Sequence, residues 1–546
     1  FASIQAVLGK SKGVSILTVT NHQGTGFAGV FTQHNDIGRT GQNVNETVLT
    51  PTNVNSTTFG KLFALAVDGQ VYAQPLYVPN VTIAGGTHNV IYVATEADTV
   101  FAFDADSNAG ANANPLWRAS LIDTAHGAAP GARAVDAVNG INCNALVPLV
   151  GITSTPVIDP STNTMYVVAK SAETGGYVQR LHAIDITTGA EKSQGSVVIT
   201  GSVPGTGDNS SNGTLVFDPL RHLNRPGLLL LNGIIYVGFG SNCDAKPYHG
   251  WLFAYDAATS SLRAIYVPTP NGSDGAIWNS GTGISGDSNA NLYIATGNGT
   301  FDTVKIPATE LSDSIVKLFL NGSSLIATDY FTPYNQGADD IGDLDVGSGG
   351  VLLLPDQPGN NPHQLVLAAK GRWMYEVNRD QMTANNLHYC LSNCTRDPQI
   401  ISEFQPIGDS WCTPAYWNGS IYYGGANGEL SVYPLNGGIL SSVASSLTSN
   451  PILFPGATPA VSASESTNGI VWAVDSSNFG GYGPPSAPAI LHAYDALNVA
   501  HELYNTTQAS NRDVMGNAVK FVVPTIANGK VYVGTQTEVD VFGLLP

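Results

Sequence analysis

Apolar strand segments recur in pairs along most of the chain, and the second segment of each pair is the easiest to recognise. Its centre is a Tyr, a Trp or an aliphatic residue flanked by further apolar positions, as expected for a strand buried on both faces. Eight such segments occur, at residues 91–93, 165–167, 235–237, 292–294, 365–367, 421–423, 471–473 and 531–533. This recurrence indicates one repeat architecture rather than a series of unrelated domains.

A short strand precedes each of these segments and another follows it. The preceding strand usually begins at a proline, which fits the first position of a strand because no backbone donor is needed there. Those positions are Pro75, Pro156, Pro226, Pro414, Pro459 and Pro524, with Gly283 and Gly350 in the two remaining units. The following strand often ends in Asp, as at Asp104, Asp185, Asp256 and Asp495, and an Asp side chain there can cap a turn.

A fourth strand completes each unit. We assign to each unit the strand that precedes its proline, beginning with residues 62–67. Eight units of four strands predict an all-β fold, an eight-bladed β-propeller of four-stranded antiparallel blades over residues 31–546. Residues 1–30 precede the first unit and form a separate N-terminal β extension.

Composition agrees with many short strands and narrows the possible partners. The 546 residues include 60 Gly and 31 Pro, and only 12% are charged, which leaves little solvent-facing material for helices. The formal net charge of −19 argues against nucleic acid or an anionic membrane as a partner. No run of about 18 apolar residues is present, so we expect no membrane span. Because residue 1 is Phe and no secretion signal follows it, we expect the processed chain of an extracellular, secreted or cell-surface protein.

Five cysteines are too few for a disulfide scaffold, and their spacing does not match a zinc site. Cys390 and Cys394, with Cys412 close behind, are placed to close a local loop, and Cys143 with Cys243 to bridge neighbouring blades. The odd count leaves one thiol free or paired between chains. Eleven Asn-x-Ser/Thr sequons are candidates for glycosylation, although such sequences are also ordinary turn chemistry. They are Asn45, Asn55, Asn80, Asn209, Asn212, Asn271, Asn298, Asn321, Asn393, Asn418 and Asn505.

The repeat resembles that of the pyrroloquinoline-quinone-like β-propellers, whose blades carry a Tyr-Val strand, then a strand ending in Ala-Phe/Tyr-Asp, then a Thr-Gly turn. Residues 181–185 and the Thr188-Gly189 turn are one example, and the resemblance extends over about residues 30–546. Segments 35–43, 69–75 and 159–163 are similar to a subgroup of secreted bacterial propellers described as quinoprotein-like. The resemblance implies the blade architecture and does not by itself imply a bound quinone.

Alcohol dehydrogenases of this family hold the quinone at the axis of an eight-bladed propeller. The quinone lies between a tryptophan and a disulfide of adjacent cysteines, and Glu, Asn and Asp bind calcium. This sequence has no Cys-Cys pair, its seven Trp residues do not recur at one blade position, and no calcium ligand or catalytic Asp can be transferred by position. We therefore expect no catalytic residue and no cofactor. The alternative is an alcohol or sugar dehydrogenase that depends on pyrroloquinoline quinone (PQQ) and calcium.

Two further groups of residues invite a chemical interpretation. The densest acidic cluster, whose carboxylates would suit calcium, consists of Asp339, Asp340, Asp343 and Asp345. It lacks the EF-hand spacing, so we favour a solvated loop and keep the four residues as weak metal candidates. His182 and His492 occupy the same position of the repeat, after Leu and before Ala, which favours packing over catalysis. No Gly-x-Ser-x-Gly motif and no phosphate-binding loop is present.

The N-terminal extension is apolar and β-branched, unlike a disordered tail. Its candidate pairing residues are Ile4, Val14, Ile16, Leu17 and Val19. We expect it to pair either with its own propeller or, in trans, with a sheet edge of a neighbouring copy, which is a head-to-tail contact that builds rings or filaments. The leading hypothesis is therefore a non-catalytic structural glycoprotein that assembles with other copies of itself into a fibre or surface layer. The alternatives are the quinone-dependent dehydrogenase and a propeller that binds carbohydrate or protein with its loop face.

Overall fold

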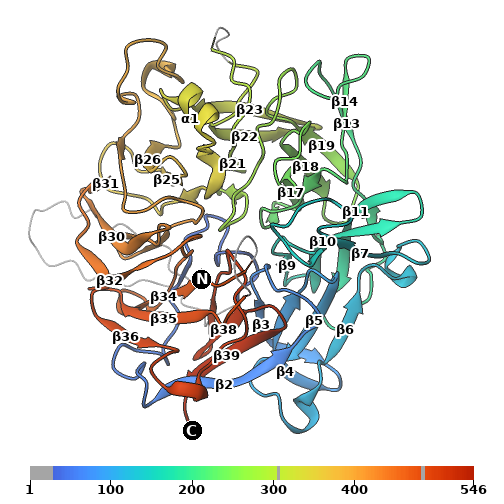
Figure 1. Cartoon of the computed structure of the whole chain (residues 1–546), viewed down its shortest axis with the longest axis vertical. Helices are drawn as coiled ribbons and strands as arrows, with labels where there is room; N and C mark the ends of the chain where they lie inside the picture. Colours follow the sequence, from blue (N-terminus) through green and yellow to red (C-terminus); the bar gives the residue numbers. More distant parts are fainter. Residues whose placement is uncertain (1–28, 304–307, 481–485) are drawn as a thin grey trace, which may run out of the picture.

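The computed structural model describes residues 29–303, 308–480 and 486–546. Within these ranges eight antiparallel blades surround a central axis (Figure 1), as the eight sequence repeats predict. The described residues contain one α-helix, α1 (Gln336–Gly342), so the expected near absence of helix is confirmed. None of their helices is long and apolar enough to cross a bilayer.

Four strands make up each blade, and the first of them lies nearest the axis. Blade 1 consists of β3 (Leu76–Ile83), β4 (Gly86–Ala94), β5 (Thr99–Asp104) and β6 (Trp117–Ser120), and blade 2 of β9 (Val157–Asp159), β10 (Thr164–Glu173), β11 (Gly176–Asp185) and β12 (Val197–Val198). Blade 3 consists of β16 (Leu229–Leu231), β17 (Ile234–Ser241), β18 (Trp251–Asp256) and β19 (Leu262–Tyr266), and blade 4 of β20 (Ser285–Gly286), β21 (Asn291–Ala295), β22 (Ile315–Asn321) and β23 (Ser324–Phe331).

Blades 5 to 8 follow the same pattern and end with a strand from the start of the chain. Blade 5 consists of β24 (Leu352–Leu353), β25 (Gln364–Ala369), β26 (Trp373–Asn378) and β27 (Ser402–Phe404), and blade 6 of β28 (Ala415–Trp417), β29 (Ser420–Tyr423), β30 (Gly428–Asn436) and β32 (Ser446–Ile452). Blade 7 consists of β33 (Ala460–Ser464), β34 (Thr467–Asp475), β35 (Ile490–Asp495) and β36 (Glu502–Asn505), and blade 8 of β37 (Thr525–Ala527), β38 (Lys530–Gly534), β39 (Glu538–Leu544) and β2 (Phe59–Ala66).

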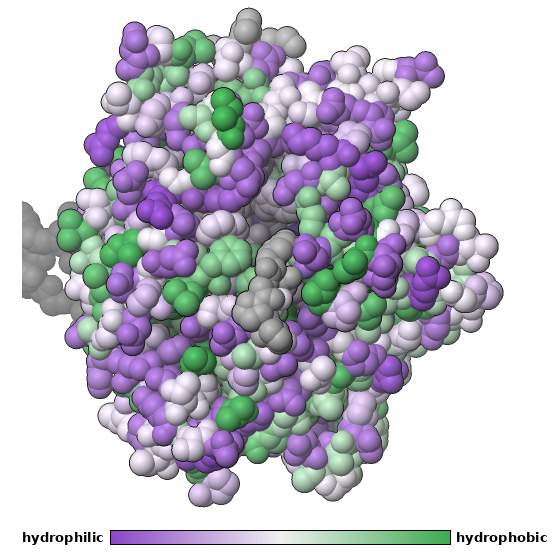
Figure 2. Space-filling view, in the orientation of Figure 1, coloured by the Kyte–Doolittle hydropathy of each residue, from purple (hydrophilic) through white to green (hydrophobic). Residues whose placement is uncertain are grey.

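Short elements decorate the blades. The strands are β1 (Gln42–Asn43), β7 (Arg133–Asp136), β8 (Leu149–Val150), β13 (Ser202–Pro204), β14 (Thr214–Val216), β15 (His222–Leu223) and β31 (Ile439–Leu440). The 3-10 helices are η1 (Gly110–Ala113), η2 (Thr124–His126), η3 (Val346–Ser348), η4 (Ala384–Asn386) and η5 (Ser510–Arg512). On the face seen in Figure 2, polar residues predominate and apolar residues are scattered among them.

The repeated Tyr and Asp connect each blade to the next. The Asp that ends the third strand accepts hydrogen bonds in the turn that follows, as Asp185 Oδ1 does from the backbone N–H of Thr187 at 2.8 Å. In four blades the Tyr hydroxyl of the second strand donates to the carbonyl just after that Asp in the neighbouring blade. The pairs are Tyr92 with Ile186 (2.9 Å), Tyr166 with Ala257 (2.8 Å), Tyr422 with Ala496 (2.9 Å) and Tyr532 with Ala105 (2.9 Å). The predicted turn capping is confirmed, and the turn also presents an acceptor to the adjacent blade.

Strand β2 closes the ring, which corrects our assignment of residues 62–67 to the first blade. It pairs antiparallel with β39, from Phe59 opposite Leu544 to Ala66 opposite Glu538, so the outer strand of blade 8 comes from the beginning of the chain (Figure 1). The strands before Pro414, Pro459 and Pro524 are likewise the outer strands of the preceding blades. Before Pro156 and Pro226 come β8 and β15, which belong to the sheets of blades 2 and 3 themselves. The β2–β39 hydrogen bonds join the two ends of the chain and hold the ring shut, together with bonds between blades 1 and 8 such as those from Tyr532 to Ala105 and from Lys530 to Asp106.

Residues 30–46, here called the axial plug, fill the channel between the first strands. They form hydrogen bonds at, or one residue before, the first strand of every blade. The bonds run from Val30 N to Tyr77 O, Ile158 N to Phe31 O, Arg39 Nη2 to Leu228 O, Gly286 N to Ile37 O, Leu353 N to Gly38 O, Tyr416 N to Thr40 O, Val461 N to Gly41 O and Asn43 Nδ2 to Ile526 O, all between 2.8 and 3.2 Å. The start of the propeller segment, which carries no blade repeat, is therefore the central support of the ring.

Candidate functional site

A cavity of about 180 Å³, here called the axial cavity, lies at the end of the axis where the first strands begin. Its walls are the segments that enter the first strands, such as Trp411 before β28, and the turns after the second strands, such as Lys370 after β25. The lining residues are Cys143, Ala145, Leu146, Leu223, Arg225, Ser241, Cys243, Asp244, Trp278, Ser280, Asp345, Ser348, Lys370, Trp411, Phe454, Lys520 and Phe521. Blades 2 to 8 all contribute, so only the closed ring creates this site.

Three basic side chains line the cavity, although the chain as a whole is strongly acidic. The Arg225 guanidinium lies 4.3 Å from the centre of the Phe521 ring, and Lys520 Nζ lies 5.4 Å from the same ring. Burial lowers the pKa of Lys520 to about 7, and the nearby Arg225 charge acts in the same direction. Lys370 differs, because the Asp345 carboxylate outweighs the effect of burial and raises its pKa.

Carboxylates and an amide surround Lys370, and of these Asp345 lines the cavity. Lys370 Nζ donates to Asp343 Oδ2 at 2.8 Å and to Asp345 Oδ2 at 3.2 Å. Asp345 Oδ1 accepts from Trp278 Nε1 at 3.2 Å and from the backbone N–H of Asn298 at 3.0 Å. The Asn298 side chain donates to Asp343 at 2.9 Å, and its own buried Oδ1 has no hydrogen-bond partner. Burial raises the pKa of Asp244 to about 6, with Asp345 contributing repulsion.

The cysteines form two disulfides. Cys143 is joined to Cys243, one of our predicted pairs, and both residues line the axial cavity. Cys390 is joined to Cys394 in a local loop, and Cys412 is a buried free thiol. The cysteines that reach the cavity are 100 residues apart in sequence, so a search for adjacent cysteines could not find this pair.

The acidic cluster of the sequence is divided among different partners. Asp339 and Asp340 lie in α1, where Asp339 Oδ1 accepts from Asn335 and Asp340 Oδ1 from the Gly299 backbone, both at 2.8 Å. Asp343 and Asp345 follow the helix and share Lys370, as described above. Throughout the described ranges, no group of three or more His, Cys, Asp or Glu residues is placed to hold a metal ion. The structure thus places Asp345 in the cavity wall and Asp343 beside it on Lys370, and metal binding by the four residues stays a prediction.

The two histidines at the shared repeat position each pair with a glutamate. His182 Nδ1 lies 2.5 Å from Glu191 Oε1, and His492 Nδ1 lies 2.7 Å from Glu502 Oε1. Burial lowers the pKa of His182. Each histidine therefore pairs with a glutamate that follows it in its own blade, and neither lines the axial cavity.

Most glycosylation candidates lie at the surface. Eight of the eleven asparagines are exposed, and Asn55, Asn298 and Asn505 are half-buried. Five have positive φ, which marks them as turn residues: Asn80, Asn209, Asn212, Asn393 and Asn418. An exposed asparagine can be modified, but exposure does not show that it is. Glycosylation therefore stays a prediction. The self-association candidates Ile4, Val14, Ile16, Leu17 and Val19 lie outside the described residues.

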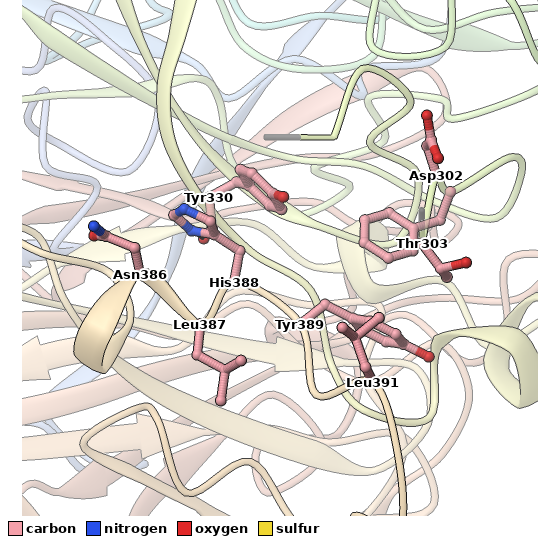
Figure 3. A pocket seen from close by; sticks show the side chains of 9 residues that line it. Asp302, Thr303, Tyr330, Asn386, Leu387, His388, Tyr389 and Leu391 are labelled. Atoms are coloured by element: carbon pink, nitrogen blue, oxygen red, sulfur yellow. Dashed lines mark hydrogen bonds between the residues drawn. The ribbon is translucent and has the colours of Figure 1, made fainter. Parts of the chain in front are cut away.

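A second, smaller pocket lies between blades 4 and 5 (Figure 3). Its wall is aromatic, with Tyr330 stacked on His388 at 4.3 Å between ring centres and Phe301 edge-on to Tyr389 at 4.9 Å. The cavity volume is about 20 Å³, which is room for about one water molecule. The axial cavity is therefore the better candidate for a functional site.

Comparison with known proteins places the fold. Searches of protein-family models and of curated proteins give no match. Among solved structures, quinohemoprotein alcohol dehydrogenase from Comamonas testosteroni aligns with a TM-score of 0.60 at 14% identity, over 94% of this chain and 80% of that one. The chain has the fold of the quinoprotein β-propellers. A europium-containing methanol dehydrogenase aligns with this propeller at a TM-score of 0.60 and 12% identity, over 95% of this chain and 98% of the other.

Sequence reasoning missed the axial cavity because its residues form no local motif. The three basic residues, Arg225, Lys370 and Lys520, come from three different blades. A usable signal was nevertheless present: each lies either just before a first strand or just after a second strand. In a propeller these two kinds of segment meet at one end of the axis, so aligning the repeats by strand would have grouped the residues.

Proposed function

We propose that the axial cavity binds a planar anionic quinone and that the protein is a quinone-binding propeller. The observation that carries this proposal is the convergence of Arg225, Lys370 and Lys520 on one cavity of a chain whose net charge is −19. PQQ is a flat tricarboxylate, and guanidinium and ammonium groups recognise carboxylates through charge-assisted hydrogen bonds. The fold shared with quinohemoprotein and methanol dehydrogenases supports the same class of ligand. If the bound quinone turns over, the protein is a dehydrogenase.

The aromatic and sulfur groups of the cavity suit a flat ring as well. Trp278 and the Cys143–Cys243 disulfide both line the site, and a tryptophan and a disulfide are the groups between which the resembling dehydrogenases hold their quinone. In this chain distant cysteines replace the adjacent pair. Trp278 is held by its Nε1 bond to Asp345, which favours a fixed ring orientation.

Calcium does not fit the arrangement of side chains as it stands. Lys370 already pairs with both Asp343 and Asp345, and a calcium ion would have to displace its ammonium group from them. No step of the proposal passes through a metal ion.

The test is a titration with PQQ, followed by tryptophan fluorescence and equilibrium dialysis, with and without added calcium. Arg225→Gln should weaken binding by about tenfold or more, because a hydrogen bond to a charged group contributes about 1.5–3 kcal/mol. Arg263→Gln is the matched control, since that side chain is 47% exposed and 3.8 Å from Asp256. Absence of saturable binding, or equal affinity of the Arg225→Gln protein, would contradict the proposal. Dye-linked alcohol oxidation then asks separately whether the bound quinone turns over.

A second function, head-to-tail self-association through residues 1–28, is favoured by where the chain joins the fold. Val30, near the start of the described chain, pairs antiparallel with Tyr77 in β3, so the described chain begins beside the first blade. An N-terminal extension that adds a strand to another copy makes a heterologous contact, which propagates into rings or filaments. Deleting residues 1–28 should abolish such assemblies in electron micrographs and leave the circular dichroism of the propeller unchanged. Polymers of the truncated chain would show that the blade surfaces build the assembly instead.

An extracellular location and surface glycans belong to the same proposal. Two disulfides support an oxidising compartment, and eight sequon asparagines are exposed. Intact mass of material from its native source, before and after enzymatic removal of N-glycans, tests this directly. A mass equal to that of the bare chain would contradict glycosylation.

A further inference from the structure

Lys520 stands apart from the other basic residues of the axial cavity. It lies just before the first strand of blade 8, lines the cavity and is only 4% exposed. Its Nζ lies 5.3 Å from the centre of the Phe479 ring and 5.4 Å from that of Phe521. Arg225 covers the same Phe521 ring at 4.3 Å, so a second cation acts on the Lys520 amine. The amine is therefore desolvated and exposed to like charge at the wall of a ligand-sized space.

The backbone beside Lys520 is unusual and supports a functional role. Phe521 has φ 65°, in the left-handed region that bulky residues avoid. Such strain persists only where the surrounding structure enforces it, and it concentrates at functional sites. Here it directs consecutive side chains, Lys520 and Phe521, to the wall of one cavity.

Two other lysines show what is special about this position. Burial lowers the pKa of both Lys170 and Lys520 to about 7, which leaves a large share of each as the free amine at neutral pH. Lys170, however, is not among the lining residues of the axial cavity. Lys370 does line the cavity, but its carboxylate partners keep it as an ammonium ion. Lys520 combines a place in the cavity wall with an amine whose pKa is lowered to about 7.

We propose that Lys520 is a nucleophile that forms an imine with the carbonyl group of an anionic aromatic aldehyde, ketone or quinone, whose acidic group Arg225 holds. The proposal rests on the axial cavity being a ligand site. Amine nitrogen attacks the carbonyl carbon, and the carbinolamine then loses the former carbonyl oxygen as water, which carries away both amine protons. The reaction consumes no oxidant or reductant and is reversible by hydrolysis.

The charged groups around the site define its pH dependence. Arg225 is the charged group that acts on the Lys520 amine, and the carboxylates of the cavity, Asp244 and Asp345, come from blades 3 and 5. Because burial and Arg225 both disfavour the ammonium form, imine formation should rise with pH through about 7. An ordinary surface lysine would reach the same rate only near pH 10.

Reductive trapping tests the proposal on the full-length protein. The probe is 4-formylbenzoate with sodium cyanoborohydride, and peptide mass spectrometry locates the resulting secondary amine. At pH 7 the label should fall on Lys520 at least tenfold more than on Lys370 or Lys170. Lys520→Arg and Lys520→Met should both lose this label, with unchanged circular dichroism as the check of folding. Arg225→Gln should raise the half-saturating concentration of 4-formylbenzoate about tenfold more than that of neutral benzaldehyde, which should change only because the Lys520 pKa rises.

The outcomes separate this inference from the quinone proposal. PQQ binding without label on Lys520 would overturn the nucleophile and leave the binding proposal standing. Label on Lys520 without quinone binding would support the nucleophile and overturn the quinone. Labelling spread evenly over surface lysines, or equal labelling at pH 6 and pH 8, would also overturn the role of Lys520.

Discussion

The axial plug should be essential for stability, and Arg39 is the residue that tests this most directly. Its side chain is fully buried, and burial lowers its pKa to about 10, so it remains charged at neutral pH. The guanidinium donates to the carbonyls of Gln33 (2.8 Å), Leu228 (3.2 Å) and Ile284 (2.6 and 3.0 Å) and to Thr32 Oγ1 (2.6 Å). It thereby ties the plug to blades 3 and 4.

Replacing Arg39 by Met keeps much of the volume and removes every donor. Three buried carbonyls lose this donor, and an unsatisfied buried acceptor costs about 1–3 kcal/mol. Removing a desolvated charge offsets part of that loss, so we expect a net destabilisation of about 3–5 kcal/mol. Arg263→Met, at an exposed position, should change stability by about 0.5 kcal/mol or less.

Two measurements check the Arg39→Met prediction. Guanidinium-induced unfolding followed by tryptophan fluorescence should show a lower midpoint than for the wild type and for Arg263→Met. Hydrogen exchange should accelerate at amides that donate to plug carbonyls, such as those of Leu353, Tyr416 and Val461, and stay slow in the second and third strands. A variant with an unchanged midpoint and unchanged exchange would refute the idea that the plug supports the ring.

Three further changes test the blade contacts, a buried histidine and the cavity disulfide. Tyr166→Phe removes a hydrogen bond between two blades and should destabilise the protein by about 1 kcal/mol or more in thermal unfolding. Tyr236 occupies the same repeat position, and its hydroxyl forms no hydrogen bond among the described residues. Tyr236→Phe is therefore the control and should have a smaller effect. Burial lowers the pKa of His222 to about 4. Because the unfolded chain, with a histidine pKa of about 6.5, binds the proton more tightly than the folded protein, stability is lost as the pH falls below about 6.5. Between pH 6.5 and pH 4 the wild type should therefore lose up to about 3 kcal/mol more than His222→Phe, and parallel stability curves would contradict this. Replacing Cys143 and Cys243 together by Ser should cost about 2–4 kcal/mol and weaken quinone binding, and equal affinity would show that the disulfide is not part of the site.

The number of blades and the first three strands of each were predictable from the sequence alone. A buried second strand with its central Tyr, a proline at the start of a strand and an Asp that caps a turn are local features, because burial and backbone geometry act within a few residues. Tyr166 and Asp256 illustrate this: each was recognisable in its own repeat. The Cys143–Cys243 pairing was also among the expectations, since the repeat placed both residues near neighbouring blades.

Only the tertiary structure decided how the ring closes and what its axis contains. The pairing of β2 with β39 and the contacts of residues 30–46 with all eight blades join positions far apart in sequence, and local periodicity carries no information about such partners. The axial cavity follows the same rule, because Arg225, Lys370 and Lys520 meet only after the blades are arranged in a circle. When the blades close into a ring, segments at equivalent repeat positions become neighbours at the axis. The charges and pKa values of their side chains then depend on residues from several blades.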